Sequence, residues 1–226
     1  MATGVQPGQH TGARSTAKGG AADPKRARLL EAAAEIFAER GYYATTVRDI
    51  SKRADANIAA VNYHFGDKLG LYTEVLRTNA RSVGQDTIRP VLEQAAAPQD
   101  VLRKVIHALI QRMCGSGHAS LPFRLMRHEL MRPTPVLSQV VDEAMRPNYD
   151  RMRALVGALL GLPPDHETTR LCVHSIMGQV LFYPLASPLL ARLWPQLKLT
   201  PQRLDRIADH IADFSVAYLQ AARVRS

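Results

Sequence analysis

Two hydrogen-bond donors and a cation lie within six residues in the first third of the chain, where Tyr63 and His64 are followed by Lys68. A phenol, an imidazole and an ammonium group are side chains that contact phosphates, because each can donate a hydrogen bond to an anionic oxygen. Tyr63 and His64 end a short stretch with helical spacing, 57–64. Val61 within this stretch and Phe65 directly after it are predicted to point inward. This cluster indicates a surface that meets the backbone of a nucleic acid.

Two short helices joined by a three-residue break, 55–57, are expected to position this cluster. The first opens at Thr46 with an S/T-x-x-D/E pattern, a capping-box start completed by Asp49. The second runs from Asn57 to His64. This spacing is typical of a helix-turn-helix, in which the second helix lies in the major groove and the first crosses the DNA backbone.

Helix signals on either side complete a compact unit. Asp23-Pro24 is a strong helix start, because an N-cap acceptor is followed by a proline whose missing N–H costs nothing there. Gly41 suits the left-handed position that ends this helix. Asp67 can cap a fourth helix, which carries Leu69, Tyr72, Val75 and Leu76.

The run from residue 28 to residue 76 resembles the DNA-binding domain of the TetR family. The matching features are F-A-E-R-G-Y at the end of the first helix, T-T-V-R-D-I in the second, N-Y-H-F at the end of the third and D-K at the start of the fourth. The resemblance implies base-facing and phosphate-facing positions in the third helix, and a guanine contact from the second. Carried over, the base-facing residues are Ile58, Ala59 and Ala60, the phosphate-facing residues are Asn62, Tyr63, His64 and Lys68, and the guanine contact is Arg48.

The chain departs from the family pattern at three of these positions. Position 55, commonly Gly, is Asp, which tolerates a left-handed backbone better than most residues. Position 58, often polar, is Ile, and position 62, often Tyr, is Asn. Because the base-facing residues are apolar, recognition is expected to rely on thymine methyl contacts, on Arg48 and on DNA shape.

Helical stretches separated by Gly and Pro fill the chain beyond about residue 98, and no convincing alternating strand occurs. We therefore predict an all-α fold, with an N-terminal three-helix helix-turn-helix domain followed by a larger helical ligand-binding and dimerisation domain. The expected boundaries are a flexible tail at 1–22, the DNA-binding domain at 23–70 and the larger domain at 71–226.

The C-terminal part resembles the CecR-like subgroup of the TetR family. The similarity lies in H-E-L-M-R-P-T-P at 128–135, L-V-G-A-L-L-G at 155–161 and S-I-M-G-Q-V-L-F-Y at 175–183. It implies repression that a small molecule relieves. Isolated polar groups beside Met, Phe and Tyr are the candidate ligand contacts, because such pockets are apolar with a few orienting polar groups. They are Arg124, His128, Gln179 and Tyr183.

Two alternatives stand beside the ligand hypothesis. Arg124 and His128 belong to a polar cluster with Arg127 and Glu129, for which a network that stabilises its helix, or an exposed face, is favoured over ligand contact. Five methionines could provide adaptable side chains for a pocket, but ordinary core filling is the favoured explanation. They are Met126, Met131, Met145, Met152 and Met177.

A homodimer is expected through helices near 170–190 and 201–222. The segment 173–182 is apolar nearly all round and contains small residues, so it must be covered on every side. Segment 201–222 carries an apolar stripe. The predicted dimer contacts are Ser175, Gly178, Phe182, Ile207, Ile211, Phe214 and Tyr218.

Composition and charge narrow the class of protein. The net charge of +9 favours an acidic partner, nucleic acid ahead of a membrane surface, although the basic residues are spread along the chain. Cys114 and Cys172 lack a C-x-x-C partner, so buried apolar roles are favoured over redox sensing. His107, His174 and His210 lack the spacing of a metal site.

The expected protein is thus a cytoplasmic, ligand-responsive regulator that binds a DNA operator as a homodimer, with a small-molecule effector and no membrane partner. No cofactor and no enzymatic activity are predicted, because the sequence contains neither a nucleophile–base motif nor a phosphate-binding glycine loop. The alternative is a helical protein-interaction adaptor that binds DNA through net charge alone.

Overall fold

A computed structural model describes residues 1, 23–94, 96–115 and 119–224, so the predicted flexible tail lies outside the described residues except for Met1. The described residues form α-helices and two π-helical segments, η1 and η2, and contain no strand, which confirms the all-α prediction. The N-terminal elements are α1 (Pro24–Ala44), α2 (Val47–Arg53), α3 (Ile58–Phe65), α4 (Lys68–Ser82), η1 (Val83–Ile88) and α5 (Arg89–Leu92). The remaining elements are α6 (Pro98–Cys114), α7 (Leu121–Met131), α8 (Leu137–Val140), η2 (Val141–Met145), α9 (Arg146–Leu160), α10 (Glu167–Leu185), α11 (Ser187–Leu193) and α12 (Pro201–Arg223).

The first four helices begin where the sequence predicts. Asp23, Thr46 and Asp67 each accept a hydrogen bond from a backbone amide in the first turn of α1, α2 and α4, respectively. The predicted capping box is present, because Asp49 also accepts hydrogen bonds from Thr46. Gly41 has a φ of 73°, and α1 continues for three residues beyond this kink instead of ending there.

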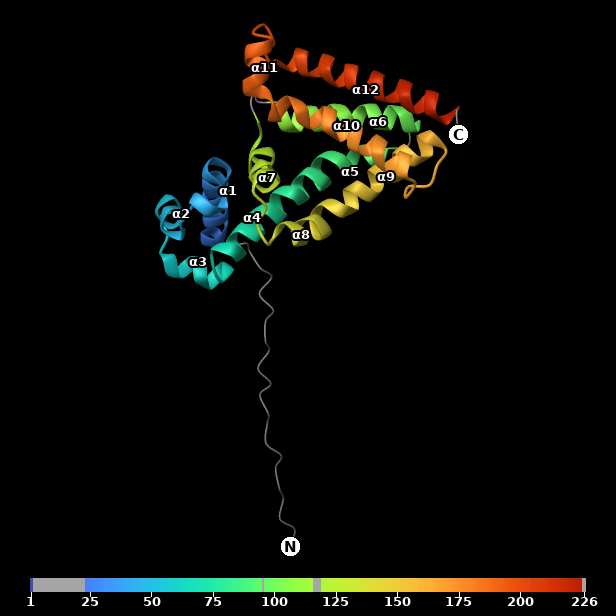
Figure 1. Cartoon of the computed structure of the whole chain (residues 1–226). Coiled ribbons are helices and arrows are strands. Elements are labelled where there is room, and N and C mark those ends of the chain that lie inside the picture. The colour runs from blue at the N-terminus through green and yellow to red at the C-terminus, as the bar shows by residue number, and fades with distance from the viewer. Residues whose placement is uncertain (2–22, 95, 116–118, 225–226) are drawn as a thin grey trace.

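Helices α1, α2 and α3 form a compact cluster, and α4 runs diagonally from it into the rest of the molecule (Figure 1). The core of this cluster contains residues of α1 and the first half of α4, such as Phe37 and Leu76, together with Leu125 of α7. Four residues beyond the predicted boundary at residue 70 pack in this N-terminal core: Leu71, Tyr72, Val75 and Leu76.

The larger C-terminal part is a helical body with its own hydrophobic core. Helices α6, α10 and α12 lie together at the end of the molecule away from α3 (Figure 1). The core is built from residues of α6, α9, α10 and α12, including Ile106, Val156, Val180 and Ile211. Within the described residues no single helix is long and apolar enough to cross a membrane, although the pair α10 and α11, bent by 75°, meets the length and composition criteria together.

Helix α12 begins at Pro201 as predicted, but its buried face differs from the predicted stripe. Leu204, Ile207 and Ile211 are buried, whereas Phe214 and Tyr218 are 62% and 55% exposed. The buried face of α12 also includes three residues that were not predicted to belong to it: Ala212, Val216 and Leu219. By the helical period, Phe214 and Tyr218 lie on the same side of the stripe as Ile207, so the period alone does not explain their exposure; in the second half of α12 the buried face turns away from this side, toward Val216 and Leu219.

Candidate nucleic-acid interface and internal cavity

Local sequence fixes the turn between α2 and α3. Asp55 adopts a left-handed backbone with a φ of 48°, at the position where the family pattern commonly has Gly. Asn57 then caps α3 by accepting a hydrogen bond from the Ala59 amide at 3.0 Å. Val61 is fully buried, so it anchors α3 on the core and turns the opposite side of the helix outward.

The outward side of α3 carries most of the predicted base-facing and phosphate-facing residues. Ile58 is 45% exposed and Tyr63 is 85% exposed, and Ala59 and Asn62 are also exposed. Ala60 is half-buried and packs against the core. Arg48 on α2 is exposed as well. These two helices thus present an accessible surface with an aromatic hydroxyl, an amide and a guanidinium group.

His64 and Lys68 lie behind this surface. The His64 side chain is only 10% exposed, and its Nε2 lies 3.4 Å from Oδ2 of Asp23, the residue that caps α1. The ammonium group of Lys68 donates hydrogen bonds of 2.9 Å to the carbonyl oxygens of Tyr42 and Thr45, and it lies 4.1 Å from the centre of the Tyr42 ring. His64 therefore links α3 to the start of α1, and Lys68 links the start of α4 to the end of α1.

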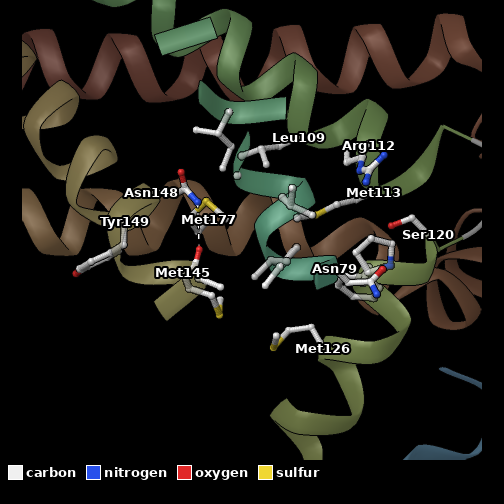
Figure 2. Close-up of a pocket in the computed structure, with 18 of the residues that line it drawn as sticks. Asn79, Leu109, Arg112, Met113, Ser120, Met126, Met145, Asn148, Tyr149 and Met177 are labelled. Carbon is white, nitrogen blue, oxygen red and sulfur yellow. Dashed lines mark hydrogen bonds between the residues drawn. The ribbon is translucent and has the colours of Figure 1, made fainter. Parts of the chain in front are cut away.

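The body contains a partly open cavity of about 340 Å³ between α4, η1, α6, α7, η2, α9 and α10. Its wall is mainly apolar, and Figure 2 shows the polar side chains at its two sides. Arg112, Asn79 and Ser120 lie on one side, and Asn148 and Tyr149 lie on the other. The volume is at the lower end of the range typical of small-molecule pockets, about 300–1,000 Å³.

None of the four residues proposed from the sequence as ligand contacts lines this cavity. His128 lies against α1, where its Nε2 is 3.2 Å from the Ala38 carbonyl oxygen and its ring faces Gly41. Gln179 makes a hydrogen bond within α10, to the Ser175 carbonyl. Tyr183 packs on the body core, and burial raises the pKa of its hydroxyl. Arg124 is half-buried on α7.

Of the residues considered in the sequence, the methionines predicted the wall of the cavity better than the polar candidates did. Four of the five methionines considered in the sequence line it, together with Met113, whereas Met131 is 77% exposed. The four are Met126, Met145, Met152 and Met177. They come from α7, η2, α9 and α10, so no periodicity within one helix could have grouped them.

An exposed apolar face covers parts of α10, α11 and α12. Phe182 and Phe214 lie on it, and Ser175 and Gly178 are exposed on α10, where a Cβ on Gly178 would meet nothing within 4 Å. The larger exposed apolar residues of these helices are Leu171, Phe182, Leu185, Leu189, Leu193, Phe214 and Tyr218. Ile207 and Ile211 are 6% and 2% exposed and pack inside the body core, not on the exposed apolar surface, so the structure gives the prediction that they form a dimer contact no support.

Ion pairs connect the N-terminal cluster to the wall of the cavity through α4. Glu74 pairs with Arg26 of α1 at 2.9 Å and with Arg77 at 3.2 Å. Arg77 in turn lies 2.9 Å from a carboxylate oxygen of Glu143 in η2. Segments η1 and η2 both contribute to the cavity wall, and π-helical turns occur frequently at functional sites.

A second connection is buried between α4 and α7. The Tyr72 hydroxyl donates a 2.7 Å hydrogen bond to Glu129, whose other oxygen accepts from the amide and hydroxyl of Thr134. Both Tyr72 and Glu129 are 0% exposed. Burial, and then the hydrogen bond to Glu129, raise the pKa of Tyr72 far above its usual value.

Among the described cysteines and histidines, the two thiols are buried and His107 and His174 have polar partners. Both cysteines are buried, and burial raises the pKa of the Cys114 thiol to about 11. His107 lies 2.8 Å from Asp209 on α12, and His174 contacts Tyr149. Within the described part of the chain, no group of three or more His, Cys, Asp or Glu side chains is placed to hold a metal ion.

Two family models match the chain. Residues 29–75 match the bacterial regulatory proteins of the tetR family, and residues 98–221 match the C-terminal domain of the HTH-type transcriptional dual regulator CecR. Among curated proteins, the HTH-type transcriptional dual regulator CecR of Shigella flexneri is 30% identical over 168 residues, which are 70% of this chain and 74% of that protein.

Solved structures share the fold. FadR of Bacillus subtilis in complex with stearoyl-CoA has a TM-score of 0.64 and 16% sequence identity, with coverage of 84% of this chain and 97% of FadR. AibR in complex with isovaleryl coenzyme A and operator DNA also has a TM-score of 0.64, with 18% identity and the same coverages. At these identities the likeness establishes the architecture.

Proposed function

This chain belongs to the TetR family of bacterial DNA-binding transcriptional regulators, with a C-terminal domain of the CecR type, and from that premise we propose its mode of action. It binds a pseudo-palindromic operator as a homodimer and represses transcription until a small, largely apolar molecule occupies the cavity. The observation that carries the proposal is the exposed side of α3 joined by α4 to an apolar cavity in the same chain.

In the proposed complex, α3 lies in the major groove. Ile58 and Ala59 are exposed and apolar, so they suit contact with thymine methyl groups. Arg48 is the base-reading cation, because a guanidinium group donates two hydrogen bonds to guanine. Asn62 and Tyr63 contact phosphates, and these contacts fix the register of α3 on the duplex.

The positions of His64 and Lys68 support a different role from that of Tyr63. Two of the three donors of the Lys68 ammonium group are occupied by carbonyl oxygens of the α1–α2 region, which leaves one for a phosphate. We therefore assign Lys68 mainly to positioning α2 and α3 relative to each other. His64, beside Asp23, does the same for the start of α1.

Selection of bound sequences from a random duplex pool tests DNA reading. A pseudo-palindromic site is expected, because a two-turn recognition helix needs two half-sites for specific affinity. Arg48→Ala should relax preference at one position per half-site by about 1–3 kcal/mol. Lys68→Ala should weaken binding to all sequences and lower the slope of log affinity against log salt by at most about one unit.

Lys198→Ala, which removes the same charge from an exposed position of the body, is the matched control. It should change neither the affinity for DNA nor the slope of log affinity against log salt. If the pool yields no preferred sequence and all variants bind alike, the chain is a helical adaptor that meets DNA through net charge.

The exposed face of α10–α12 supports the homodimer. Its residues are large and apolar, and an extensive exposed apolar patch marks an interaction surface. Gly178→Glu should separate the dimer, because it buries an unpaired carboxylate in the contact. Ser138→Glu places the same charge on exposed α8 and should leave the mass in solution unchanged. A wild-type protein that is monomeric at micromolar concentration contradicts this part of the proposal.

Coupling between cavity and DNA is assigned to α4. Its first residues pack with α1 and its last turn borders the cavity, while Glu74 and Arg77, in the middle of the helix, pair with Arg26 of α1 and Glu143 of η2. A ligand that prefers one orientation of α4 shifts the spacing of the two recognition helices in a dimer. The complexes of FadR with stearoyl-CoA and of AibR with isovaleryl coenzyme A and operator DNA support small-molecule binding by this architecture.

The effector hypothesis is tested by screening apolar molecules for thermal stabilisation and then for release of the selected operator. A coupling of about 1–3 kcal/mol changes operator affinity by roughly 5–150-fold. Met177→Trp, which fills the cavity from α10, should abolish ligand binding and keep operator binding. Ligands that bind the cavity and leave operator affinity unchanged contradict the regulatory role, without affecting the DNA-binding assignment.

A further inference from the structure

Arg112 is the only charged residue among the described residues that line the cavity. It is an exposed residue of α6 that borders the cavity on the side where Asn79 and Ser120 also lie (Figure 2). The rest of the wall is mainly methionine, leucine, valine and other apolar residues. A cavity with one cation and a mainly apolar wall is complementary to a molecule that has one polar end and an apolar body.

No carboxylate pairs with this cation within the described part of the chain. The guanidinium group of Arg112 donates one hydrogen bond, of 2.9 Å, to the Ser82 hydroxyl, which itself donates to the Asn79 carbonyl. A guanidinium group has five donors arranged to match a carboxylate or phosphate, so Arg112 retains donors for an anion.

From this arrangement we infer that the ligand of the cavity is an amphiphile with an apolar body and a single anionic group, and that Arg112 binds the anionic group. The inference rests on the proposed function, and it adds the chemical class of the effector and the residue that recognises it. The cavity of about 340 Å³ takes the apolar body, and Met113, Met126 and Met177 adapt to its shape.

The position of Ser82 gives this contact a consequence for α4. Ser82 is the last residue of α4, and η1 begins at the next residue. An anion bound to the remaining donors of Arg112 therefore lies close to the α4–η1 junction. The head group acts on the end of the helix whose other end begins at Lys68, beside α3.

The test uses decanoate and 1-decanol, which share an apolar chain and differ in charge, as probes for the full-length protein. Affinities are measured by displacement of a neutral fluorescent hydrophobe, below the concentration at which decanoate forms micelles. Arg112→Gln should weaken decanoate binding about 10-fold, because a charge-assisted hydrogen bond is lost, and leave decanol within twofold. Arg112→Lys should retain part of the preference, and decyl phosphate identifies which anionic group binds more tightly.

Lys104→Gln is the matched control, because Lys104 is exposed on the same helix and its loss changes the net charge equally. A loss of decanoate affinity in Lys104→Gln equal to that in Arg112→Gln overturns the inference in favour of bulk charge. Equal losses for decanoate and decanol in Arg112→Gln overturn it in favour of a structural role. Unchanged decanoate binding in Arg112→Gln overturns it directly.

The outcome also separates this inference from the proposed function. If neither probe binds the wild-type protein, the inference and the effector role of the cavity both fail, while operator selection and solution mass still report on DNA binding and dimerisation. If decanoate binds through Arg112 and operator affinity does not change, the ligand class stands and the coupling through α4 fails.

Discussion

The N-terminal cluster and the helical body begin their helices in different ways. Each of α1, α2, α3 and α4 begins beside a residue whose own side chain accepts a hydrogen bond from the first turn. In the body, α10 and α12 begin so, at His166 and Thr200, whereas α6, α7 and α9 have a proline at their first or second position and no side-chain cap. The cluster is closely packed around Phe37, and the body contains a cavity bordered by two π-helical segments.

This difference separates a rigid part from an adaptable one. Side-chain caps and a filled core fix each helix of the cluster locally, so the exposed side of α3 keeps one geometry. The helices of the body depend on packing against one another, and a cavity lined by methionines removes part of that packing. A DNA-reading surface needs the first property, and a ligand sensor needs the second.

The largest expected effect compares truncations in the two parts. Phe37 is 0% exposed, and its ring lies 4.7 Å from that of Tyr72, so Phe37→Ala should cost about 3–5 kcal/mol in the free energy of unfolding. Met177 already borders the cavity, so Met177→Ala removes fewer contacts and should cost about 1 kcal/mol. Urea unfolding of both variants measures the costs, and equal costs would contradict the distinction between the two parts.

A smaller effect is expected where the two parts meet. Tyr72→Phe removes the hydroxyl that donates to the buried Glu129 carboxylate, at a cost of about 2 kcal/mol. The pKa of Tyr72 is raised in the folded protein, so the folded state holds this proton more tightly than the unfolded chain. The stability that Tyr72 contributes is therefore complete below about pH 10, the unfolded pKa, and falls as the pH rises above it.

Urea unfolding of wild type and Tyr72→Phe between pH 8 and pH 11 tests this dependence. The difference between the two proteins should shrink above pH 10. A difference that stays constant over this range would show that the hydroxyl proton does not contribute, and the buried link between α4 and α7 would need another explanation.

Loss of one cap should have an effect of about 1 kcal/mol. Thr46→Ala removes the acceptor for the Asp49 amide and one donor to the Asp49 carboxylate. Hydrogen bonds from the Thr46 hydroxyl and amide hold the pKa of Asp49 below its usual range. The part of this contribution that comes from the Asp49 carboxylate is present above about pH 4 and is lost as the pH falls through the folded pKa, so the difference between the two proteins should narrow in acid. Unfolding curves at pH 7 and pH 3 provide the comparison.

The cap signals explain why the N-terminal cluster was predictable residue by residue. Asp23, Thr46, Asn57 and Asp67 act on amides two or three positions away, so their effect is visible in a short window of sequence. The inward positions of His64 and Lys68 were not predictable in this way. Their partners lie on another helix, such as Tyr42 on α1, 26 residues from Lys68.

The body was predictable as helices but not as a site. Residues from seven elements line the cavity. The position of Arg112 at the cavity depends on neighbours that are distant in sequence, such as Ser82, 30 residues earlier. The sequence reading chose Gln179 and Tyr183 because polar groups stood among apolar ones, yet they lie outside the cavity wall. On α12, the period of the helix predicted burial at Ile207 correctly, but it did not distinguish the chain's own core from a partner's surface.

The smallest expected effect concerns the turn that joins α2 to α3. Asp55 holds a φ of 48°, a left-handed conformation that costs a residue with a Cβ about 1–2 kcal/mol, whereas Gly adopts it freely. Gly also loses more conformational entropy on folding, which offsets about 0.5–1 kcal/mol of that gain. Asp55→Gly should therefore stabilise the protein by about 0.5 kcal/mol in urea unfolding. Asp55→Ala, which keeps the Cβ and loses the polar side chain, is the matched variant and should destabilise it. If Asp55→Gly instead lowers stability and operator affinity together, the Asp55 side chain fixes the angle between α2 and α3, and the rigidity of the reading surface depends on this turn as well as on its caps.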